Sequence, residues 1–455
     1  MIRLIRSFRL WGLILIALHL AAPLLPEPLA WGVWPATYLP AGLRWSLALV
    51  AAALALRGDA LWRRIRPAFA GLAWPGWLGR ALPLVIAGLS VIPFYLFRIR
   101  HLRWGDAYIL ANAIPHPDVQ LTYVWQAPLD VFLHARLWQL ANRLWGWPDP
   151  IPVYWAVSTL CGAVFVWAAL RLAASLGRDA AERLLTVGLL LTLGTMQLFF
   201  GYIENYSIMA VGVTLFLWLG LRTLRDGLPL AWPATALALT HAFHPSTIIL
   251  APGLLYLAYL LHRQGRASAR QLLASMAVPY VIVLVGVFAL MTAGQHGLDA
   301  LLGVDAPGGA DRRWFVPLFA VTTRWEHYTM FSLAHLLDIL NQQLLSAPAI
   351  WPALILTAVL GWRALPRQDG VFRWLALLAL LYLFLTLVWN PDYGGQRDWD
   401  LFSPAALPAA VLLAHVLGRA LPDRAMLAAA GWALIAAQAF HTLAWIYQNT
   451  LPYAV

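Results

Sequence analysis

The chain contains no lysine and a single cysteine, Cys161, and only 11% of its 455 residues are charged. One cysteine excludes an internal disulfide and any metal site built from cysteines, and packing within an apolar segment is its expected role. A charged fraction this low, beside 62% hydrophobic residues, lies outside the range of soluble globular domains. Repeated apolar runs of about twenty residues are typical of a polytopic helical membrane protein.

Thirteen apolar stretches can be drawn along the chain, so we expect an all-α membrane protein with about thirteen transmembrane helices. The first stretch reaches Pro23 without a small-residue cleavage site, which predicts a first transmembrane helix and not a cleaved signal peptide. We expect residues 1–455 to form a single integral-membrane domain.

The basic residues indicate how the chain is oriented. All 31 are arginine, and if the N-terminus is cytoplasmic, 21 of them fall on the cytoplasmic side and 9 outside. This positive-inside bias predicts a multi-pass protein of the inner (plasma) membrane with a cytoplasmic N-terminus. The net charge of +11 therefore follows from membrane orientation and does not indicate a nucleic-acid partner.

Polar residues are concentrated in three connections on the predicted outer side, residues 98–150, 294–347 and 390–404. We expect these connections to form an active-site face, because long loops in a compact protein usually carry function. Leucines recur at helical spacing over residues 129–145 and 333–345, which predicts two interfacial helices that frame an outer cavity.

Asp106 is the first candidate for chemistry, a few residues beyond the third apolar stretch. A carboxylate close to the bilayer and flanked by aromatic residues has a raised pKa and is suited to act as a base. Two structural alternatives stay open from the sequence. Asp106 pairs with Arg100 or Arg103, or it caps a helix that begins at Ala107.

Glu204 lies in a tight outer turn, residues 201–207, where it has almost no loop in which to leave the membrane. An ionisable group in this position is functional or tightly paired with an arginine. We include its neighbours Asn205 and Tyr206 among the candidate substrate-binding residues. His241 and His244 share a turn between two short apolar stretches, and without cysteines or nearby acids they favour hydrogen bonding or phosphate contact over metal binding.

The densest polar segment is residues 389–402, in which Gly394 and Gly395 permit a tight turn. Its acidic and basic candidates are Asp398, Asp400 and Arg397. The planar guanidinium of Arg397 is suited to phosphate, and Arg312 with Arg313 offers a second outer cationic site. For each of these residues the alternative is a solvated loop charge or a lipid headgroup contact. The acid pair is a weak metal signal, so a divalent ion is left open.

These features together resemble the GT-C superfamily of integral-membrane glycosyltransferases, which take sugars from polyprenyl-phosphate donors. The likeness rests on the number of spans, on Asp106 as the acid early in the first long outer loop, and on outer interfacial helices. Many members carry two acids where this chain has Asp106 between Gly105 and Ala107. The chain is also expected to lack the long soluble C-terminal domain of oligosaccharyltransferases.

The resemblance implies hexosyl or pentosyl transfer at the outer, periplasmic face, in biosynthesis of a cell-envelope glycan. Its partners would be membrane lipids, a polyprenyl-phosphate sugar donor, and a lipid, glycan or protein acceptor. Asp106 would be the catalytic base, and Arg397, with Arg312 or Arg313, would hold the phosphate. The remaining candidates would bind or orient the sugar: Glu204, Asn205, Tyr206, His241, His244, Asp398 and Asp400.

Two other classes of protein remain open from the sequence. A transporter or flippase for an anionic lipid or glycan would use the same outer cations, although its substrate groups should lie near the membrane midplane. A scaffold subunit that has lost catalysis would also retain the architecture.

Overall fold

A computed structural model describes residues 1–70, 76–124, 126–297, 300, 318–322 and 326–453. These residues form helices and turns, and none of them lies in a β-strand. Nine helices within the described residues are long and apolar enough to cross a membrane, or ten if one pair bent by 100° counts as a single span. The chain is therefore an all-α, multi-pass membrane protein, as predicted.

Every predicted span coincides with a helix, but four of these helices do not meet the criteria of length and apolarity for a span. They are α4 (Gly76–Leu96), α8 (Ala180–Leu191), α10 (Ala231–Phe243) and α14 (Ile350–Leu360). The 13 residues of α10 reach about 20 Å, whereas the hydrocarbon core of a bilayer is about 30 Å thick. Because helices of 11 to 13 residues, such as α8, α10 and α14, cross only part of a bilayer, the count of thirteen stays a prediction.

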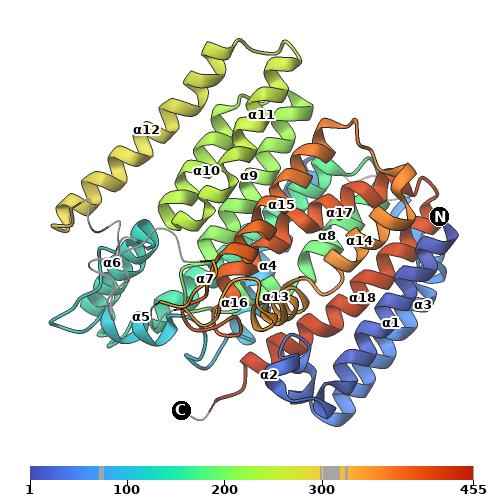
Figure 1. Ribbon diagram of the computed structural model, residues 1–455, viewed down its shortest axis with the longest axis horizontal. Helices are drawn as coiled ribbons and strands as arrows, with labels where there is room; N and C mark the ends of the chain where they lie inside the picture. Colours follow the sequence, from blue (N-terminus) through green and yellow to red (C-terminus); the bar gives the residue numbers. More distant parts are fainter. Residues whose placement is uncertain (71–75, 125, 298–299, 301–317, 323–325, 454–455) are drawn as a thin grey trace.

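The last helix, α18 (Arg424–Asn449), packs against α1 (Ile2–Ala21) and α3 (Ala41–Ala70), so helices from the beginning and the end of the sequence lie side by side (Figure 1). Small residues make this approach close: a Cβ added at Gly12 would lie 2.6 Å from the carbonyl oxygen of Ala433. Close backbone approach through glycine and alanine is a common way to pack transmembrane helices.

A second group of helices is arranged around α7 (Ile151–Leu176), which packs against α4, α8 and α9 (Ser207–Asp226). The remaining long helices are α11 (Ala251–Arg263), which the short helix Pro245–Leu250 precedes, α12 (Ala269–Ala293), α15 (Gly370–Val388) and α17 (Ala406–Ala420). The span containing α17 has 94% of its apolar window buried, whereas that of α12 has 6%. The segment through α17 is therefore the centre of the bundle, and α12 lies at its edge (Figure 1).

Both predicted interfacial helices are present, as α6 (Pro128–Trp145) and α13 (Leu333–Ser346). In α6 the leucines lie on the exposed side: Leu140 and Leu144 are more than half exposed, while Asp130 and His134 are buried. In α13 only part of the stripe is exposed, because Leu344 packs against core residues. An apolar stripe turned outward fits a helix that lies in a membrane interface. Periodicity finds such a stripe but does not tell whether lipid or protein covers it.

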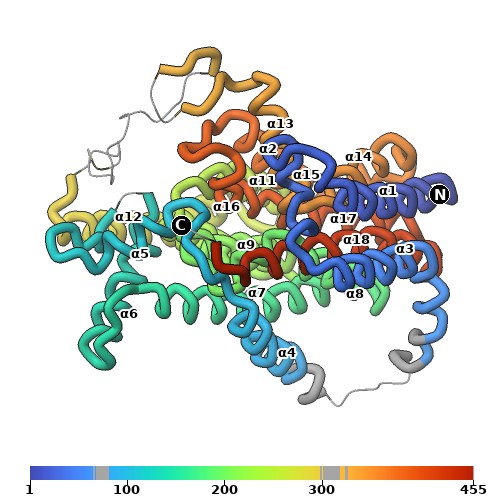
Figure 2. Tube along the Cα trace, turned by 90° about the horizontal axis from the view of Figure 1, so that it is seen from below, coloured from blue at the N-terminus to red at the C-terminus, as the bar shows by residue number. Residues whose placement is uncertain are grey.

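The connections that the sequence predicts to be outside meet on one side of the bundle. Figure 1 shows α5 (Ala107–Ala113) and α6 toward its left and the short helix α16 (Trp399–Phe402) and α13 near its middle, and Figure 2 places α5 and α6 at one end of the molecule. Helices that alternate in direction bring the ends of α4 and α18 and the start of α9 to this side. Residues separated by 345 positions, as Trp104 and Asn449 are, thereby become neighbours.

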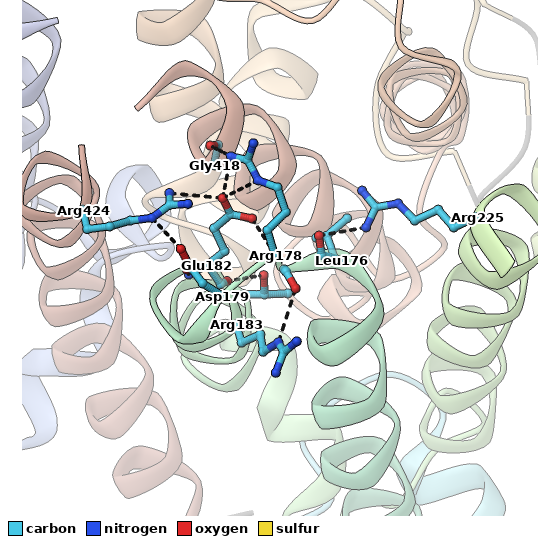
Figure 3. Close-up of polar contacts among 10 residues, drawn as sticks. Leu176, Arg178, Asp179, Glu182, Arg183, Arg225, Gly418 and Arg424 are labelled. Atoms are coloured by element: carbon cyan, nitrogen blue, oxygen red, sulfur yellow. Dashed lines mark hydrogen bonds and ion pairs between the residues drawn. The ribbon is translucent and has the colours of Figure 1, made fainter. Parts of the chain in front are cut away.

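At the start of α18, the end away from the connections described above, a cluster of ion pairs joins two parts of the chain (Figure 3). The guanidinium of Arg178 lies 2.6 Å from the Glu182 carboxylate, and Arg424 lies 3.2 Å from Glu182 and 2.5 Å from Asp179. Arg178 also donates to the carbonyl oxygen of Gly418 at 2.5 Å. Two arginines and two acids therefore join the α7–α8 loop to the α17–α18 loop.

Candidate functional site

The loop that carries Asp106 is fixed across the end of α18. Its backbone N–H at Ile99 donates to Phe200 O at 2.9 Å, and that of Arg100 donates to Asn449 O at 3.1 Å. The indole of the buried Trp104 donates to Asn449 Oδ1 at 2.6 Å. These bonds place the next two residues, Gly105 and Asp106, at a defined position relative to the bundle.

The partly buried Asp106 stands at the N-cap of α5, but its side chain makes no cap hydrogen bond. It accepts a hydrogen bond from the Tyr393 hydroxyl at 2.8 Å. Arg103, one of the predicted ion-pair partners, lies instead 3.7 Å from Glu27. Within the described residues, no ion pair joins Asp106 to an arginine, so neither structural alternative accounts for this carboxylate.

Burial raises the pKa of Asp106 above its ordinary value, and the Tyr393 hydrogen bond and the charge of Arg397 oppose this effect only in part. A carboxylate with a raised pKa is a stronger base once it is ionised. Asp106 therefore combines partial exposure with the acid–base property that proton abstraction needs.

Glu204 contacts the backbone of the loop that carries Asp106. Its buried carboxylate accepts hydrogen bonds from the backbone N–H groups of Asp106 and of Asn205, the latter at 3.0 Å. Burial and the negative charges of Asp106 and Asp400 raise the pKa of Glu204 well above its ordinary value. No arginine pairs with Glu204 in the described part of the chain, so the predicted Glu204–Arg bridge is not what holds it.

Gly105 is the close contact that makes this arrangement possible. Its φ of +48° lies in the left-handed region, and a Cβ there would overlap Glu204 Oε1 and lie 3.1 Å from Asp400 Oδ2. Its N–H donates to Arg397 O at 3.0 Å. Gly105 thus joins three predicted segments, those of Asp106, Glu204 and Asp400.

Asp398 and Asp400, both in the segment 389–402, accept hydrogen bonds from different partners. Asp398 Oδ2 accepts from the Tyr393 N–H at 2.7 Å, and burial raises the pKa of Asp398 well above its ordinary value. Asp400, 1% exposed, accepts from the Tyr202 hydroxyl at 2.8 Å and from the Leu401 N–H at 2.9 Å. Both acids are therefore satisfied by neutral donors.

No group of three or more histidine, cysteine, aspartate or glutamate side chains within the described residues is arranged to hold a metal ion. Dependence on a divalent ion stays open.

Arg397 is the cation closest in sequence to these acids. It is exposed, and its guanidinium lies over the Tyr393 ring, 4.8 Å from the ring centre. An exposed planar guanidinium beside a carboxylate site is available to an anionic ligand. The predicted second cationic site, Arg312 and Arg313, falls outside the described residues.

The two histidines differ in position. The His244 ring lies 4.8 Å from the Tyr206 ring, so His244 adjoins the turn that carries Glu204. His241 contacts the hydroxyls of Thr247 at 2.7 Å and Tyr280 at 3.0 Å, which leaves both of its ring nitrogens engaged away from the acids. The structure therefore groups His244 with the site and gives His241 a packing environment of its own.

Asn205 offers a free acceptor in the same turn. Its side-chain oxygen is buried and has no hydrogen-bond partner among the described residues. This atom is one polar group of the site that a ligand could satisfy.

Three residues that connect the site were not singled out from the sequence. Tyr393 and Tyr202 lie within the predicted segments and donate to Asp106 and Asp400. Asp338 of α13 accepts hydrogen bonds from Trp31 Nε1 at 3.2 Å, from the Tyr328 hydroxyl at 3.1 Å and from the Gly395 N–H at 3.1 Å. For the tyrosines the only signal was their position beside the acids, and for Asp338 it was an acid on a leucine-striped helix.

The described residues form a bundle of transmembrane helices in which a loop acid lies against buried carboxylates at one end. The fold is similar to that of ArnT from Cupriavidus metallidurans in the apo state. The TM-score is 0.51 at 13% sequence identity, over 83% of this chain and 78% of that chain.

ArnT from the same organism bound to undecaprenyl phosphate gives a TM-score of 0.49 at 14% identity, over 82% of this chain and 77% of that chain. No protein-family model matches the sequence, and no curated protein matches it either. At such low identity the likeness concerns the fold alone, which is ArnT-like.

Proposed function

We propose that this protein is a membrane glycosyltransferase that moves a hexosyl or pentosyl unit from a polyprenyl-phosphate donor to a lipid, glycan or protein acceptor. The observation that carries the proposal is the Asp106 carboxylate. It is partly exposed, has no arginine partner within the described residues, and stands beside buried acids and an exposed arginine. The ArnT-like fold supports it, and ArnT itself binds undecaprenyl phosphate.

In the proposed reaction, Asp106 takes the proton of the acceptor hydroxyl as its oxygen attacks the anomeric carbon. The new bond joins that oxygen to the anomeric carbon, and the bond from this carbon to the phosphate oxygen breaks. The electron pair leaves with the polyprenyl phosphate, whose developing charge Arg397 stabilises. The proton remains on Asp106 until it passes to solvent.

The other polar groups would hold the sugar. Glu204, with a raised pKa, orients the Asp106 backbone and keeps the loop acid in place. Asn205 Oδ1 and His244 offer hydrogen-bonding groups to sugar hydroxyls, as do Asp398 and Asp400. The arginine bias of the sequence supports an outer location for these residues, and in that orientation the donor would reach them from the outer leaflet of the membrane.

The test is release of polyprenyl phosphate from a panel of polyprenyl-phosphate sugars by the purified protein, with acceptor mixtures present. Asp106→Asn should lower turnover by about a thousandfold, because general base catalysis contributes about 10²–10⁴. Asp118→Asn, an exposed acid of the same outer loop, is the matched control and should leave turnover unchanged.

Normal turnover by the Asp106→Asn protein would remove Asp106 as the base. If the wild-type protein binds donors but releases no polyprenyl phosphate with any acceptor, the result would favour a scaffold subunit without catalysis. Absence of both binding and release would favour transport.

A further inference from the structure

A small cavity lies beside the candidate active site and is lined by four indole rings, from Trp31, Trp34, Trp104 and Trp445. Its empty volume is about 220 Å³ including the open space at its mouth, and its floor has room for about one water molecule or hydroxyl group. Glu27, Gln396 and Gln448 complete the lining. Aromatic faces with a few polar groups are the usual composition of a small-molecule site.

Two buried polar atoms of these lining residues lack partners among the described residues. They are the indole nitrogen of Trp445, a donor, and the side-chain oxygen of Gln448, an acceptor. Both residues are 2% exposed, and they stand three positions apart on one face of α18. Because buried polar groups are normally hydrogen-bonded, an unpaired donor and acceptor beside one cavity indicate a polar occupant.

The cavity shares a wall with the candidate active site. Trp104 directly precedes Gly105 and Asp106, and Gln396 directly precedes Arg397. The N–H of Gly105 donates to Arg397 O at 3.0 Å, so these two segments are bonded to each other where they separate the cavity from the acids.

The chemistry of the lining fits a sugar better than other occupants. A sugar ring has apolar C–H faces that pack on indole and hydroxyls at its edge that need donors and acceptors. A lipid tail would leave the Trp445 and Gln448 atoms unsatisfied. Phosphate would meet the Glu27 carboxylate, and an ammonium group would find that carboxylate already 3.7 Å from Arg103.

From these observations we infer that the cavity is a saccharide subsite: one sugar ring packs on the tryptophans at the mouth and places a hydroxyl between Trp445 Nε1 and Gln448 Oε1. The enclosed part of the cavity admits one hydroxyl group, so the ring itself lies outside it, against the tryptophans at the mouth. The inference rests on the proposed function only for the role of that sugar, which belongs to the donor or to the acceptor.

The binding test uses the full chain in lipid nanodiscs, free of sugar-based detergent, and a panel of methyl hexosides and methyl pentosides. Saturation-transfer NMR and calorimetry should detect binding of at least one glycoside to the wild-type protein. Gln448→Met, which removes the acceptor at similar volume, and Trp34→Ala should each weaken binding by about tenfold. Trp45→Ala, a tryptophan of α3 that is 53% exposed, is the matched control and should bind like wild type.

If no methyl glycoside binds to the wild-type protein, or if Gln448→Met and Trp34→Ala bind as wild type does, the cavity holds water only and the inference is overturned. Gln448→Met in the transfer assay then separates the sources. A raised KM for the donor assigns the subsite to the donor sugar, and a raised KM for the acceptor assigns it to the acceptor.

Asp106→Asn keeps this result independent of the proposed function. Glycoside binding should survive in that variant while transfer is lost. Transfer that depends on Asp106 without any glycoside binding would overturn the subsite alone, and binding without Asp106-dependent transfer would overturn the proposed reaction alone.

Discussion

The two ends of α18, roughly 39 Å apart along the helix, lie among carboxylates with opposite kinds of partner. Near its first residue, Arg424 and Arg178 hold Glu182 in ion pairs (Figure 3). Beyond its last residues, Asp106 and Glu204 are held by a tyrosine hydroxyl and by backbone N–H groups. Among the described residues, the same type of side chain forms ion pairs at one end of α18 and none at the other.

The pKa shifts follow this difference. Burial alone opposes the ionisation of Glu182, but the hydrogen bonds and charge of Arg178 and the charge of Arg424 outweigh it and lower its pKa. At Asp106 burial prevails over the bond from Tyr393 and the charge of Arg397, and the pKa rises. Acids held by arginines stabilise the fold, whereas acids held only by neutral donors remain available to a substrate.

Among substitutions that leave Asp106 itself in place, Gly105→Ala should have the largest effect on turnover, because it disrupts the contacts that position Asp106. The added Cβ would overlap the Glu204 carboxylate, and a misplacement of Asp106 by about 1 Å is expected to lower turnover by about a hundredfold. Steady-state turnover measures the effect. Gly146→Ala is the matched control, because Gly146 also has a left-handed φ, +70°, but nothing lies within 4 Å of its added Cβ.

Both variants should lose about 1 kcal/mol of stability from backbone strain, so the strain itself is common to the pair. Only the Gly105 variant should lose turnover. Equal turnover in the two variants would show that the contact among Gly105, Glu204 and Asp400 does not position the loop.

Glu182→Ala tests the ion-pair cluster at the start of α18. It leaves Arg178 and Arg424 without their shared acid, and the free energy of unfolding should fall by about 1–3 kcal/mol with turnover of the folded protein unchanged. A thiol-reactive fluorophore measures thermal unfolding through Cys161, the chain's single cysteine. Asp106→Asn should leave the unfolding temperature near that of the wild type.

Asp226→Ala is the control for loss of an ordinary ion pair. Asp226 pairs with Arg222 at 3.1 Å, but both side chains are more than a third exposed, so its removal should cost no more than about 1 kcal/mol. If Glu182→Ala and Asp226→Ala had the same unfolding temperature, a stabilising role for the ion-pair cluster around Glu182 would be contradicted.

The sequence predicted the elements better than the contacts among them. Apolar runs located every long helix, and leucine spacing located α6 and α13 within a residue or two. The pattern could not assign faces, because in a membrane protein an apolar stripe packs against lipid as readily as against protein. The buried face of α6, with Asp130 and His134, was therefore not anticipated.

The site shows the same limit. The outer acids were found because ionisable residues are costly near a bilayer and so stand out in an apolar sequence. Their partners were not found, since the Tyr393 hydroxyl reaches Asp106 across 287 positions and the Tyr202 hydroxyl reaches Asp400 across 198. Local sequence carries no record of such long-range pairings when the donor is an uncharged tyrosine hydroxyl.

Arg397→Gln should give the smallest displacement of a measured quantity, a shift of the pH profile, and this shift tests the electrostatics of Asp106 directly. Arg397 favours the ionised form of Asp106, so its removal raises the pKa of that carboxyl further. A base must be ionised to act, and the acidic limb of kcat/KM should therefore move to higher pH, by less than about one unit because Arg397 is exposed. Lost phosphate binding would lower kcat/KM at every pH without moving the limb, so one profile separates the two roles.

Arg136→Gln is the matched control, since Arg136 is exposed and lies over the ring of Tyr123 at 5.6 Å. A limb that stays in place or moves to lower pH in the Arg397 variant would show that this arginine does not act on the Asp106 carboxylate.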